Sequence, residues 1–442
     1  MATVAERYAQ WAVAFRAQKL PKEVVHHAKR ALIDLEAAMI SGSVEAPATL
    51  LEKALAEELD RGEARLALGR PATVRAAALI NGAAAHTTEV DDIFRDGIYH
   101  PGAPTIPAAL ALAQSLGASG EAFLRAIVVG YEVSTRIGAA MGRAHYKYWH
   151  NTGTIGCFGA CAAAAELLGL DAKRFAHALA TVTTFSAGLQ QSFRMDSMSK
   201  PLHAGRAAEA GLTAALAARE GVIGSLDVID GEAGYGRAMS DGPDWEKGLA
   251  TLGRDFHITR MTFKNHTCCG HTFAAIDGAL ALQSKMGLAA KDIRKVRVGT
   301  YKAALDVAGY DEPRTPAEGR FSLKYVVATA LTHGSVRFAA FEPDRMNDAG
   351  TRALMREVEV AVDPQLDAAF PAQRAARVAI ESHDGRREEF LQPTRIGDPD
   401  APLSDAQLDA KFLELAVPVL GDAEARARLA GLWKIDAEPR IK

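Results

Sequence analysis

Hydrophobic positions recur at helical spacing through the first 255 residues of the chain. Between Val24 and Ile40 the apolar residues stand three or four apart and Gly42 follows, as expected for an amphipathic helix and its end. Further runs of this kind cover residues 76–86, 107–116, 120–142, 156–168, 173–187 and 204–220. Alternating β-branched patterns are nearly absent from this part. It is therefore predicted to be all-helical.

The pattern changes near residue 256. Segments 293–298 and 358–362 alternate apolar and polar residues at a period near two, which is typical of half-buried strands. Segments 376–381 and 386–390 flank Asp384-Gly385 and predict a β-hairpin. Helical patterns lie between these strands, so the region predicts an α+β domain of ordinary size.

The predicted fold is therefore mainly α with an α+β lid. Residues 1–255 form a large all-helical domain, and residues 256–399 form the smaller α+β lid domain. Residues 404–432 are helical again, and we expect the C-terminal helices of 400–442 to return to the first domain. The length of 442 residues also favours two domains over one core.

Composition and charge exclude several classes of protein. The chain has 48% hydrophobic and 24% charged residues, which is typical of globular proteins rather than disordered or fibrous ones. Its 51 basic and 54 acidic residues give a net charge of −3, and no polybasic block stands out. Nucleic acid and anionic membrane surfaces are thus not expected as partners.

Cysteine usage and the apolar segments predict a soluble cytoplasmic protein. Four cysteines are too few for a disulfide framework, and Cys268 and Cys269 are adjacent, which favours reduced thiols. The N-terminal residues lack the basic and apolar regions of a signal peptide. The most apolar stretch, 153–168, is interrupted by Glu166 and is too short to span a bilayer.

The sequence lacks several common cofactor and catalytic motifs. It contains no P-loop, no Gly-x-Ser-x-Gly elbow and no His-Glu-x-x-His motif. Gly153, Gly156 and Gly159 follow no predicted strand, so they do not form a dinucleotide fingerprint. Any catalysis should therefore depend on side chains alone or on a cofactor without such a motif.

A cluster of ionisable residues lies between two predicted helices. Glu89, Asp91 and Asp92 follow His86, and His100 precedes the next helix. Neighbouring carboxylates raise one another's pKa and keep a nearby histidine charged, which suits acid–base chemistry. A capped, solvated loop is the alternative interpretation.

Two further helix starts carry histidine or lysine. His150 precedes residues 151–152, which can cap a helix, and a helix N-terminus favours a neutral imidazole that accepts a proton. Lys200 and His203 surround Pro201, which suggests that Lys200 lies just outside the helix and faces a cleft. A buried structural histidine and an ordinary surface lysine are the alternatives.

The segment from Lys264 to His271 invites a metal interpretation. It contains Cys268 and Cys269 as well as histidines, but adjacent cysteines cannot easily fill two corners of a tetrahedral zinc site. We expect no metal here. A junction loop that places Lys264 and a histidine in an interdomain cleft is favoured, because ligand sites favour such clefts.

Together these segments resemble the MmgE/PrpD family, which includes 2-methylcitrate dehydratase, cis-aconitate decarboxylase and iminodisuccinate epimerase. The resemblance extends over residues from about 20 to 400 in order and spacing. The residues that carry it are Asn81-Gly82, His86, Asp91-Asp92, His100-Pro101, Trp149-His150-Asn151-Thr152-Gly153, Ser199-Lys200-Pro201-Leu202-His203, Lys264, Ile276-Asp277 and Arg320-Phe321-Ser322-Leu323-Lys324-Tyr325.

The resemblance implies a homodimer with a cleft between a large helical domain and an α+β lid, and it implies neither metal nor organic cofactor. By position, His100, His150, Lys200 and Tyr325 match residues that line the family's active site, and Asp91 and Asp92 lie in its acidic motif. Two departures concern the chemistry. Glu89 replaces the first aspartate found in some members, and Cys269 stands where the decarboxylase has histidine, with His271 two residues on.

The predicted function is that of a cofactor-independent hydro-lyase similar to 2-methylcitrate dehydratase. It would abstract a proton α to a carboxylate of a small di- or tricarboxylate substrate. The predicted catalytic residues are His150, Asp91, Asp92, Lys200, Tyr325 and His100, and the predicted substrate-binding residues are Glu89, His203, Lys264, Cys269 and His271.

Within this set the base is His150 or one of the Asp91 and Asp92 carboxylates, while Tyr325 or a protonated histidine donates to the leaving hydroxyl. Alternatives are an epimerase of an amino- or imino-dicarboxylate and a cis-aconitate-type decarboxylase. The two departures make decarboxylation the activity that the resemblance supports least. A metal-dependent hydrolase and a non-enzymatic helical binding protein are the alternatives from other classes.

Overall fold

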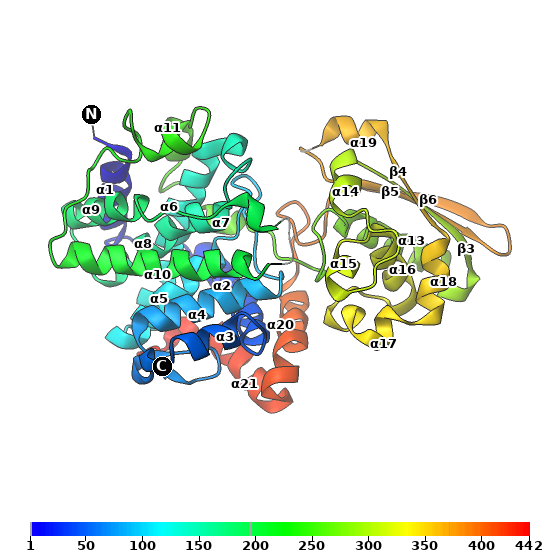
Figure 1. Cartoon of the computed structure of the whole chain (residues 1–442), viewed down its shortest axis with the longest axis horizontal. Coiled ribbons are helices and arrows are strands. Elements are labelled where there is room, and N and C mark those ends of the chain that lie inside the picture. The colour runs from blue at the N-terminus through cyan, green and yellow to red at the C-terminus, as the bar shows by residue number, and fades with distance from the viewer. Residues whose placement is uncertain (1, 194–196, 371) are drawn as a thin grey trace. The chain divides into compact units, whose positions relative to one another are not determined.

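The computed structural model describes residues 2–193, 197–370 and 372–442 and divides the chain into two compact units (Figure 1). The first unit comprises Met1–Thr262 and Ser404–Lys442, and the second comprises Phe263–Leu403. The sequence placed the corresponding boundaries at 255/256 and 399/400. The presence of a mainly helical unit and of a smaller α+β unit confirms the predicted fold class.

The first unit consists of helices that surround an alanine-rich core. Thr3, Thr73, Ser119 and Asp171 cap four of these helices by accepting backbone hydrogen bonds, as short polar side chains do at N-termini. The helices are α1 (Val4–Phe15), α2 (Lys22–Ser43), α3 (Ala48–Ala54), α4 (Val74–Thr87), α5 (Gly102–Leu116), α6 (Gly120–His145), α7 (Asn151–Thr154), α8 (Gly156–Leu167), α9 (Ala172–Thr183), α10 (Ser199–Arg219), α11 (Tyr235–Met239), α12 (Trp245–Leu249), α20 (Asp405–Leu420) and α21 (Asp422–Trp433). Short 3-10 turns are η1 (Ala56–Glu58), η2 (Gln190–Phe193), η3 (His257–Arg260) and η6 (Ile435–Ala437).

The prediction that this region is all-helical is wrong at one place. Strands β1 (Leu59–Arg65) and β2 (Pro71–Ala72) form a small antiparallel hairpin. Within β1 only Leu59 and Ala64 are buried, and the residues between them are polar or glycine. The strand therefore carries no period-two pattern that a sequence analysis could detect.

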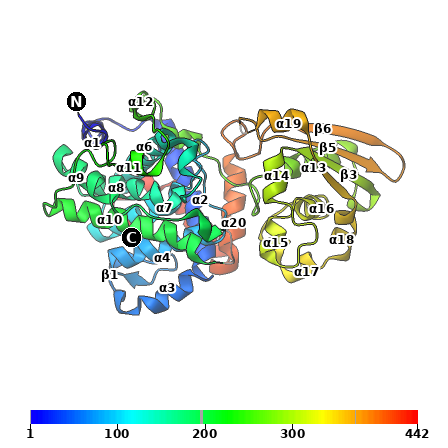
Figure 2. The ribbon, with the colours of Figure 1, turned by 45° about the horizontal axis from the view of Figure 1, so that its top comes forward.

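Helices α4 and α10 cross at very short distance because glycines stand at the crossing. A Cβ atom on Gly82 would lie 2.9 Å from Cα of Gly205, and one on Gly205 would lie 2.2 Å from the carbonyl oxygen of Leu79. The crossing places the end of α4 near the beginning of α10. The C-terminal helix α20 packs against α2 in the same unit (Figures 1 and 2).

The second unit is built on a four-stranded sheet in the order β4-β3-β5-β6. Strand β3 pairs in parallel with β4 and antiparallel with β5, and β5 and β6 form the predicted hairpin with Gly385 at φ 88°. Alternate residues of β3, such as Val296 and Val298, are buried in one apolar core to which α13 and α16 also contribute. Strands of this unit are β3 (Ile293–Thr300), β4 (Val358–Val362), β5 (Ala376–Ser382) and β6 (Arg387–Gln392). Its helices are α13 (Phe273–Met286), α14 (Lys302–Val307), α15 (Pro316–Arg320), α16 (Leu323–His333), α17 (Pro343–Met346), α18 (Ala349–Arg356) and α19 (Pro364–Ala369), with 3-10 turns η4 (Ala290–Asp292) and η5 (Phe338–Phe341).

Among the residues that the structure describes, no helix combines the length and the apolar character needed to cross a membrane.

Candidate active site

The connection between α4 and α5 contains a buried carboxylate that two histidines share. We call residues 88–92 the acidic turn. The Oδ2 atom of Asp91 lies 2.7 Å from Nδ1 of His86 and 3.2 Å from Nδ1 of His100. Burial opposes ionisation of Asp91, but the charges and N–H groups of His100 and His86 hold its pKa well below the ordinary value.

An ionised carboxylate only accepts hydrogen bonds, so His86 donates to Asp91 through Nδ1. This hydrogen bond fixes the orientation of the His86 ring. His86 is fully buried, and its Nε2 has no hydrogen-bond partner within the described part of the chain. The His100 side chain keeps 14% of its surface exposed, so it is the more accessible of the two imidazoles.

Asp92 has different partners from its neighbour. It accepts hydrogen bonds from the Tyr131 hydroxyl at 2.8 Å and from the backbone N–H of Gly102 at 3.0 Å. Burial, followed by the negative charges of Asp34 and Asp91, raises the pKa of Asp92 to about 8. Asp92 therefore fixes the beginning of α5, two residues after His100.

His150 connects the histidines at the acidic turn with the beginning of α10. Its ring stacks on that of His86 with centroids 5.4 Å apart, and its Nδ1 lies 2.9 Å from Nδ1 of His203. Burial, together with the charges of His86 and Lys200, lowers the pKa of His150 well below its ordinary value. His150 is thus a neutral imidazole near pH 7.

Lys200 pairs with Glu89, whose backbone adopts a left-handed conformation with φ 60°. Burial disfavours the charged amine, but the negative charge of Glu89 outweighs it and raises the pKa of Lys200. The sequence placed Lys200 just outside the helix, whereas the structure makes it the second residue of α10. Pro201 follows without penalty because N–H groups in a first helical turn have no intrahelical acceptor.

These contacts join most of the site residues that the sequence predicted in the first unit. One cluster contains Asp91, His100, His150, Lys200 and His203. Glu89 and Asp92 lie at its periphery. His86 was part of the motif but was not assigned a role in the site. The sequence feature that could have identified His86 as a site residue is its position five residues before Asp91.

The second unit contains the other predicted residues. Tyr325 is fully buried and its hydroxyl donates to the carbonyl oxygen of Ala340. His271 contacts the Tyr301 hydroxyl at 2.9 Å, and burial, with the charges of Arg374 and Arg395, lowers its pKa to about 4.

Lys264 is 5% exposed and Cys269 is half-buried. Cys268 and Cys269 are free thiols. The roles predicted for Tyr325, His271, Lys264 and Cys269 stay predictions.

Within the described residues, His86, Asp91 and His100 form the group suited to hold a metal ion, with ligand atoms within 4.8 Å of one another. Two histidines and a carboxylate are typical ligands of transition metals. The 2.7 Å contact of Asp91 with His86 is also a direct hydrogen bond, in which the Nδ1 proton of His86 occupies space that an ion would need.

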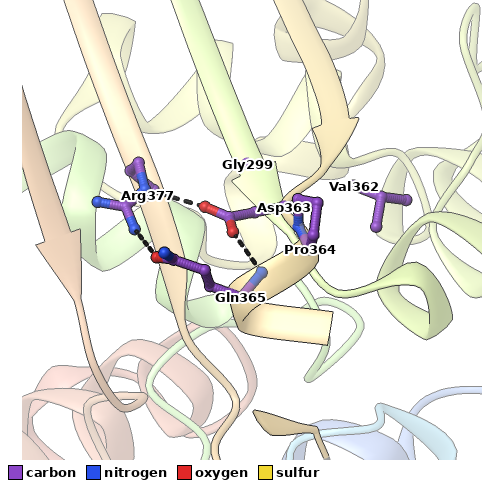
Figure 3. Close-up of a pocket in the computed structure, with 6 residues that line it drawn as sticks. All are labelled: Gly299, Val362, Asp363, Pro364, Gln365 and Arg377. Carbon is purple, nitrogen blue, oxygen red and sulfur yellow. Dashed lines mark hydrogen bonds and ion pairs between the residues drawn. The ribbon is translucent and has the colours of Figure 1, made fainter. Parts of the chain in front are cut away.

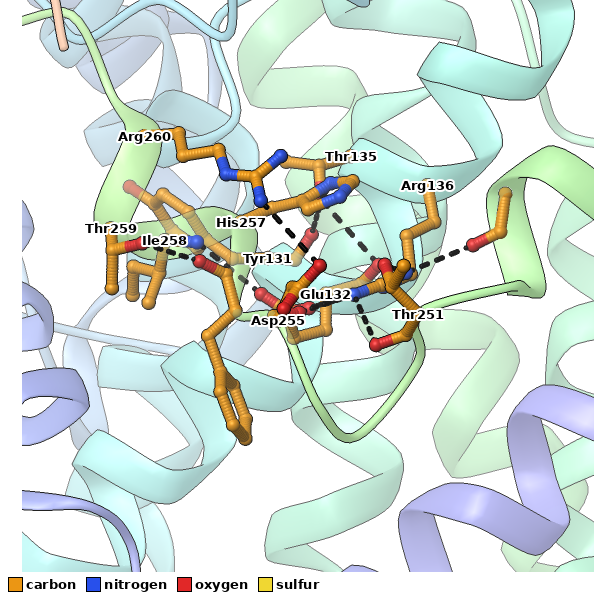
Figure 4. Close-up of polar contacts among 12 residues, drawn as sticks. Tyr131, Glu132, Thr135, Arg136, Thr251, Asp255, His257, Ile258, Thr259 and Arg260 are labelled. Carbon is orange, nitrogen blue, oxygen red and sulfur yellow. Dashed lines mark hydrogen bonds and ion pairs between the residues drawn. The ribbon is translucent and has the colours of Figure 1, made fainter.

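A buried polar band joins α6 to the segment 248–260 (Figure 4). Arg136 pairs with Glu132 and donates to the carbonyl oxygens of Gly248, Thr251 and Asp255, while Glu132 accepts from the backbone of Ile258. Burial raises the pKa of Glu132 to about 7, although Arg136 opposes this shift.

The segment held in this way ends at Thr262. Its backbone N–H and carbonyl pair with those of Ile93, directly after the acidic turn, at 2.9 Å each. The polar band therefore helps to fix the turn that carries Asp91.

A hollow in the second unit is less suited to catalysis than the cluster around Asp91 (Figure 3). Residues from β3, β4, α19 and β5 line it, among them Asp363 and Arg377. Asp363 caps α19 and pairs with Arg377 at 2.9 Å, so these charges already satisfy each other.

Comparison with known proteins identifies the same family over both parts of the chain. Residues 6–248 match the MmgE/PrpD N-terminal domain, and residues 266–435 match the MmgE/PrpD C-terminal domain. A cis-aconitate decarboxylase-like protein of Aspergillus oryzae is 28% identical over 95% of this chain and 91% of its own length. The cis-aconitate decarboxylase of Homo sapiens is 28% identical over 76% of this chain and 71% of its own length. The 2-methylcitrate dehydratase of Escherichia coli is 31% identical over 29% of this chain and 28% of its own length.

Proposed function

This chain belongs to the MmgE/PrpD family, and we propose that it is a lyase that transfers a proton at the carbon next to a carboxylate of a small di- or tricarboxylate. The observation that carries the proposal is the shared contact of Asp91 with His86 and His100, beside a neutral His150 and a cationic Lys200. A proton next to a carboxylate is weakly acidic, so its removal needs both a base and positive charge to stabilise the anion that forms.

Each side chain of the cluster has a role in this proposal. His150 takes the proton, because its neutral imidazole is the form that can accept one. Lys200 exchanges its pairing with Glu89 for a substrate carboxylate and stabilises the charge that develops on its oxygens. Asp91 keeps His100 oriented so that its Nε2 can donate a proton to the leaving group.

Dehydration is the reaction that we propose first, because it needs the base and the acid that His150 and His100 can supply. A second candidate is decarboxylation. Relatives similar over most of this chain carry the name cis-aconitate decarboxylase, among them one of Aspergillus terreus that is 24% identical over 96% of the chain. Epimerisation would need the acceptor and the donor on opposite faces of the substrate.

We further propose that the protein acts as a homodimer in the cytoplasm, without a metal or an organic cofactor. The free thiols of all four cysteines fit a reducing compartment. Histidines oriented by Asp91 and a charge supplied by Lys200 would provide general acid–base and electrostatic catalysis from side chains alone.

Product analysis tests the proposal and separates its two reactions. The purified protein is incubated with 2-methylcitrate, cis-aconitate and a panel of related hydroxy and amino di- and tricarboxylates, and the products are identified by NMR and by release of carbon dioxide. Formation of a double bond with loss of water supports dehydration, and release of carbon dioxide supports decarboxylation. Failure to convert any of these carboxylates would contradict the proposal.

A further inference from the structure

A buried lysine from the C-terminal helix α20 reaches the acidic turn. The ammonium group of Lys411 pairs with Asp34 on α2 and donates a hydrogen bond to the carbonyl oxygen of Val90 at 2.7 Å. The Lys411 side chain is 2% exposed and that of Asp34 is fully buried. Val90 directly precedes Asp91, so this contact acts on the backbone of the residue that the two histidines share.

We propose that Lys411 is a positioning residue of the site, which holds the acidic turn through Val90 so that Asp91 lies between His86 and His100. The effect of Lys411 on catalysis rests on the proposed function. The contact itself does not.

Other contacts fix the chain directly after Asp91. Ile93 pairs with Thr262 through two backbone hydrogen bonds, and Asp92 is held by Tyr131 and Gly102. The hydrogen bond from Lys411 to Val90 fixes the chain directly before Asp91.

Support is needed there because Glu89 has a left-handed backbone, which costs a non-glycine residue about 1–2 kcal/mol. Without the contact from Lys411, the turn could relax towards an ordinary backbone conformation and carry Asp91 with it.

The same unit contains a matched control for this pair. Arg428 on α21 also pairs with a carboxylate of α2, Glu36 at 2.9 Å, and also donates to a backbone carbonyl, that of Ala67 at 2.9 Å. It therefore joins a C-terminal helix to α2 in the same way. Ala67 lies outside the acidic turn, so loss of this pair should leave Asp91 in place.

The test compares Lys411→Met with Arg428→Met in the full chain. Methionine keeps most of the apolar stem but cannot donate to Val90. The proton signals of His86 and His100 at Nδ1, assigned in protein with labelled histidine, report the contacts of the two rings with Asp91 without any substrate. We expect Lys411→Met to shift or broaden these signals and Arg428→Met to leave them unchanged.

Activity supplies the second readout. Because a displacement of 1 Å can cost on the order of 100-fold in rate, Lys411→Met should lower kcat at least ~10-fold. KM should change less, since Lys411 is buried away from solvent and acts through Val90. If Lys411→Met does not fold, Asp34→Asn takes its place, because it removes the counter-ion that anchors the ammonium group and should shift the same signals.

Unchanged histidine signals in the folded variant would overturn the proposal, and so would an equal shift in Arg428→Met. A shift of the signals in a protein that converts no carboxylate would support the positioning role and contradict the proposed function instead.

Discussion

Asp91 and Asp92 are adjacent and fully buried, yet their surroundings favour opposite protonation states. Two imidazoles offer N–H groups and positive charge to Asp91, so its pKa falls. Asp92 faces a hydroxyl, one backbone N–H and the charges of Asp34 and Asp91, so its pKa rises to about 8. One motif of two acids thus provides an anion that orients the histidines and a neutral acid that holds the beginning of α5.

The Asp92→Asn variant should flatten the pH dependence of stability. The folded protein keeps a proton on Asp92 up to about pH 8, whereas the unfolded chain loses it near the ordinary pKa of 3.8. The contribution of this group is therefore full below about pH 4 and is lost as the pH rises towards 8, by at most ~1.4 kcal/mol per pH unit. Asparagine can accept from Gly102 and donate to Tyr131, so the fold should persist.

Urea unfolding of the wild type and of Asp92→Asn across this pH range measures the effect. The free energy of unfolding of the wild type should fall relative to that of the variant as the pH increases. Parallel curves would show that Asp92 is ionised in the folded protein.

Among the elements, α4 and α10 bring the site together because each places its functional residues at the shared end of their crossing. His86 lies in the last turn of α4, and Lys200 and His203 lie in the first two turns of α10. Gly82 and Gly205 permit the close approach of the two backbones.

Gly205→Ala should push the two helices apart. The new Cβ atom would meet the backbone of Leu79, which cannot move aside as a flexible side chain can, so we expect a loss of about 1–3 kcal/mol in the free energy of unfolding. The separation of His86 from Lys200 should increase and turnover should fall. Denaturant unfolding and kcat measure these effects.

Gly431→Ala is the matched control, because this glycine lies inside α21 and a Cβ atom added to it would meet no atom of the described residues within 4 Å. It should stabilise the protein by ~0.5–1 kcal/mol through helix propensity alone. Equal stability of the two variants would argue against tight packing at the α4–α10 crossing.

The sequence predicted these helices well because their apolar residues recur at helical spacing, and it predicted the strands of the second unit because they alternate. It missed the β1–β2 hairpin, where charged residues replace that alternation. His100, His150 and Lys200 could be predicted because they stand near the beginnings of helices. The expectation that residues 151–152 cap a helix is wrong, because both lie inside α7 and no side chain caps α5, α7 or α10. Tyr131 and Lys411 could not, since they reach the acidic turn from 39 and 321 residues away and carry no local signal.

At the scale of the whole molecule, the first unit is discontinuous in sequence and the second is inserted into it. Residues 404–442 contribute Lys411 and Arg428, the partners of Asp34 and Glu36 on α2. The second unit has an apolar core of its own, formed by its sheet and by α13 and α16. The two units should therefore differ in their ability to fold when each is prepared as a separate fragment.

A fragment of residues 263–403 should fold by itself, whereas residues 1–262 should not reach native stability without 404–442. Removal of the C-terminal helices takes away the Lys411 partner of Asp34 and uncovers the surface of α2 against which α20 packs. Circular dichroism and cooperative urea unfolding of both fragments measure this difference. Native-like unfolding of residues 1–262 alone would show that the C-terminal helices are dispensable.

Proton exchange tests the central claim most directly, because dehydration and epimerisation begin with removal of a proton next to a carboxylate and decarboxylation ends with addition of one. The wild type in deuterated water should incorporate deuterium at the carbon next to a carboxylate of its substrate, as read by NMR over the panel of di- and tricarboxylates. His150→Gln should slow this exchange by ~10²–10⁴-fold while the protein stays folded. Absence of exchange in the wild type, or an equal rate in His150→Gln, would contradict the account.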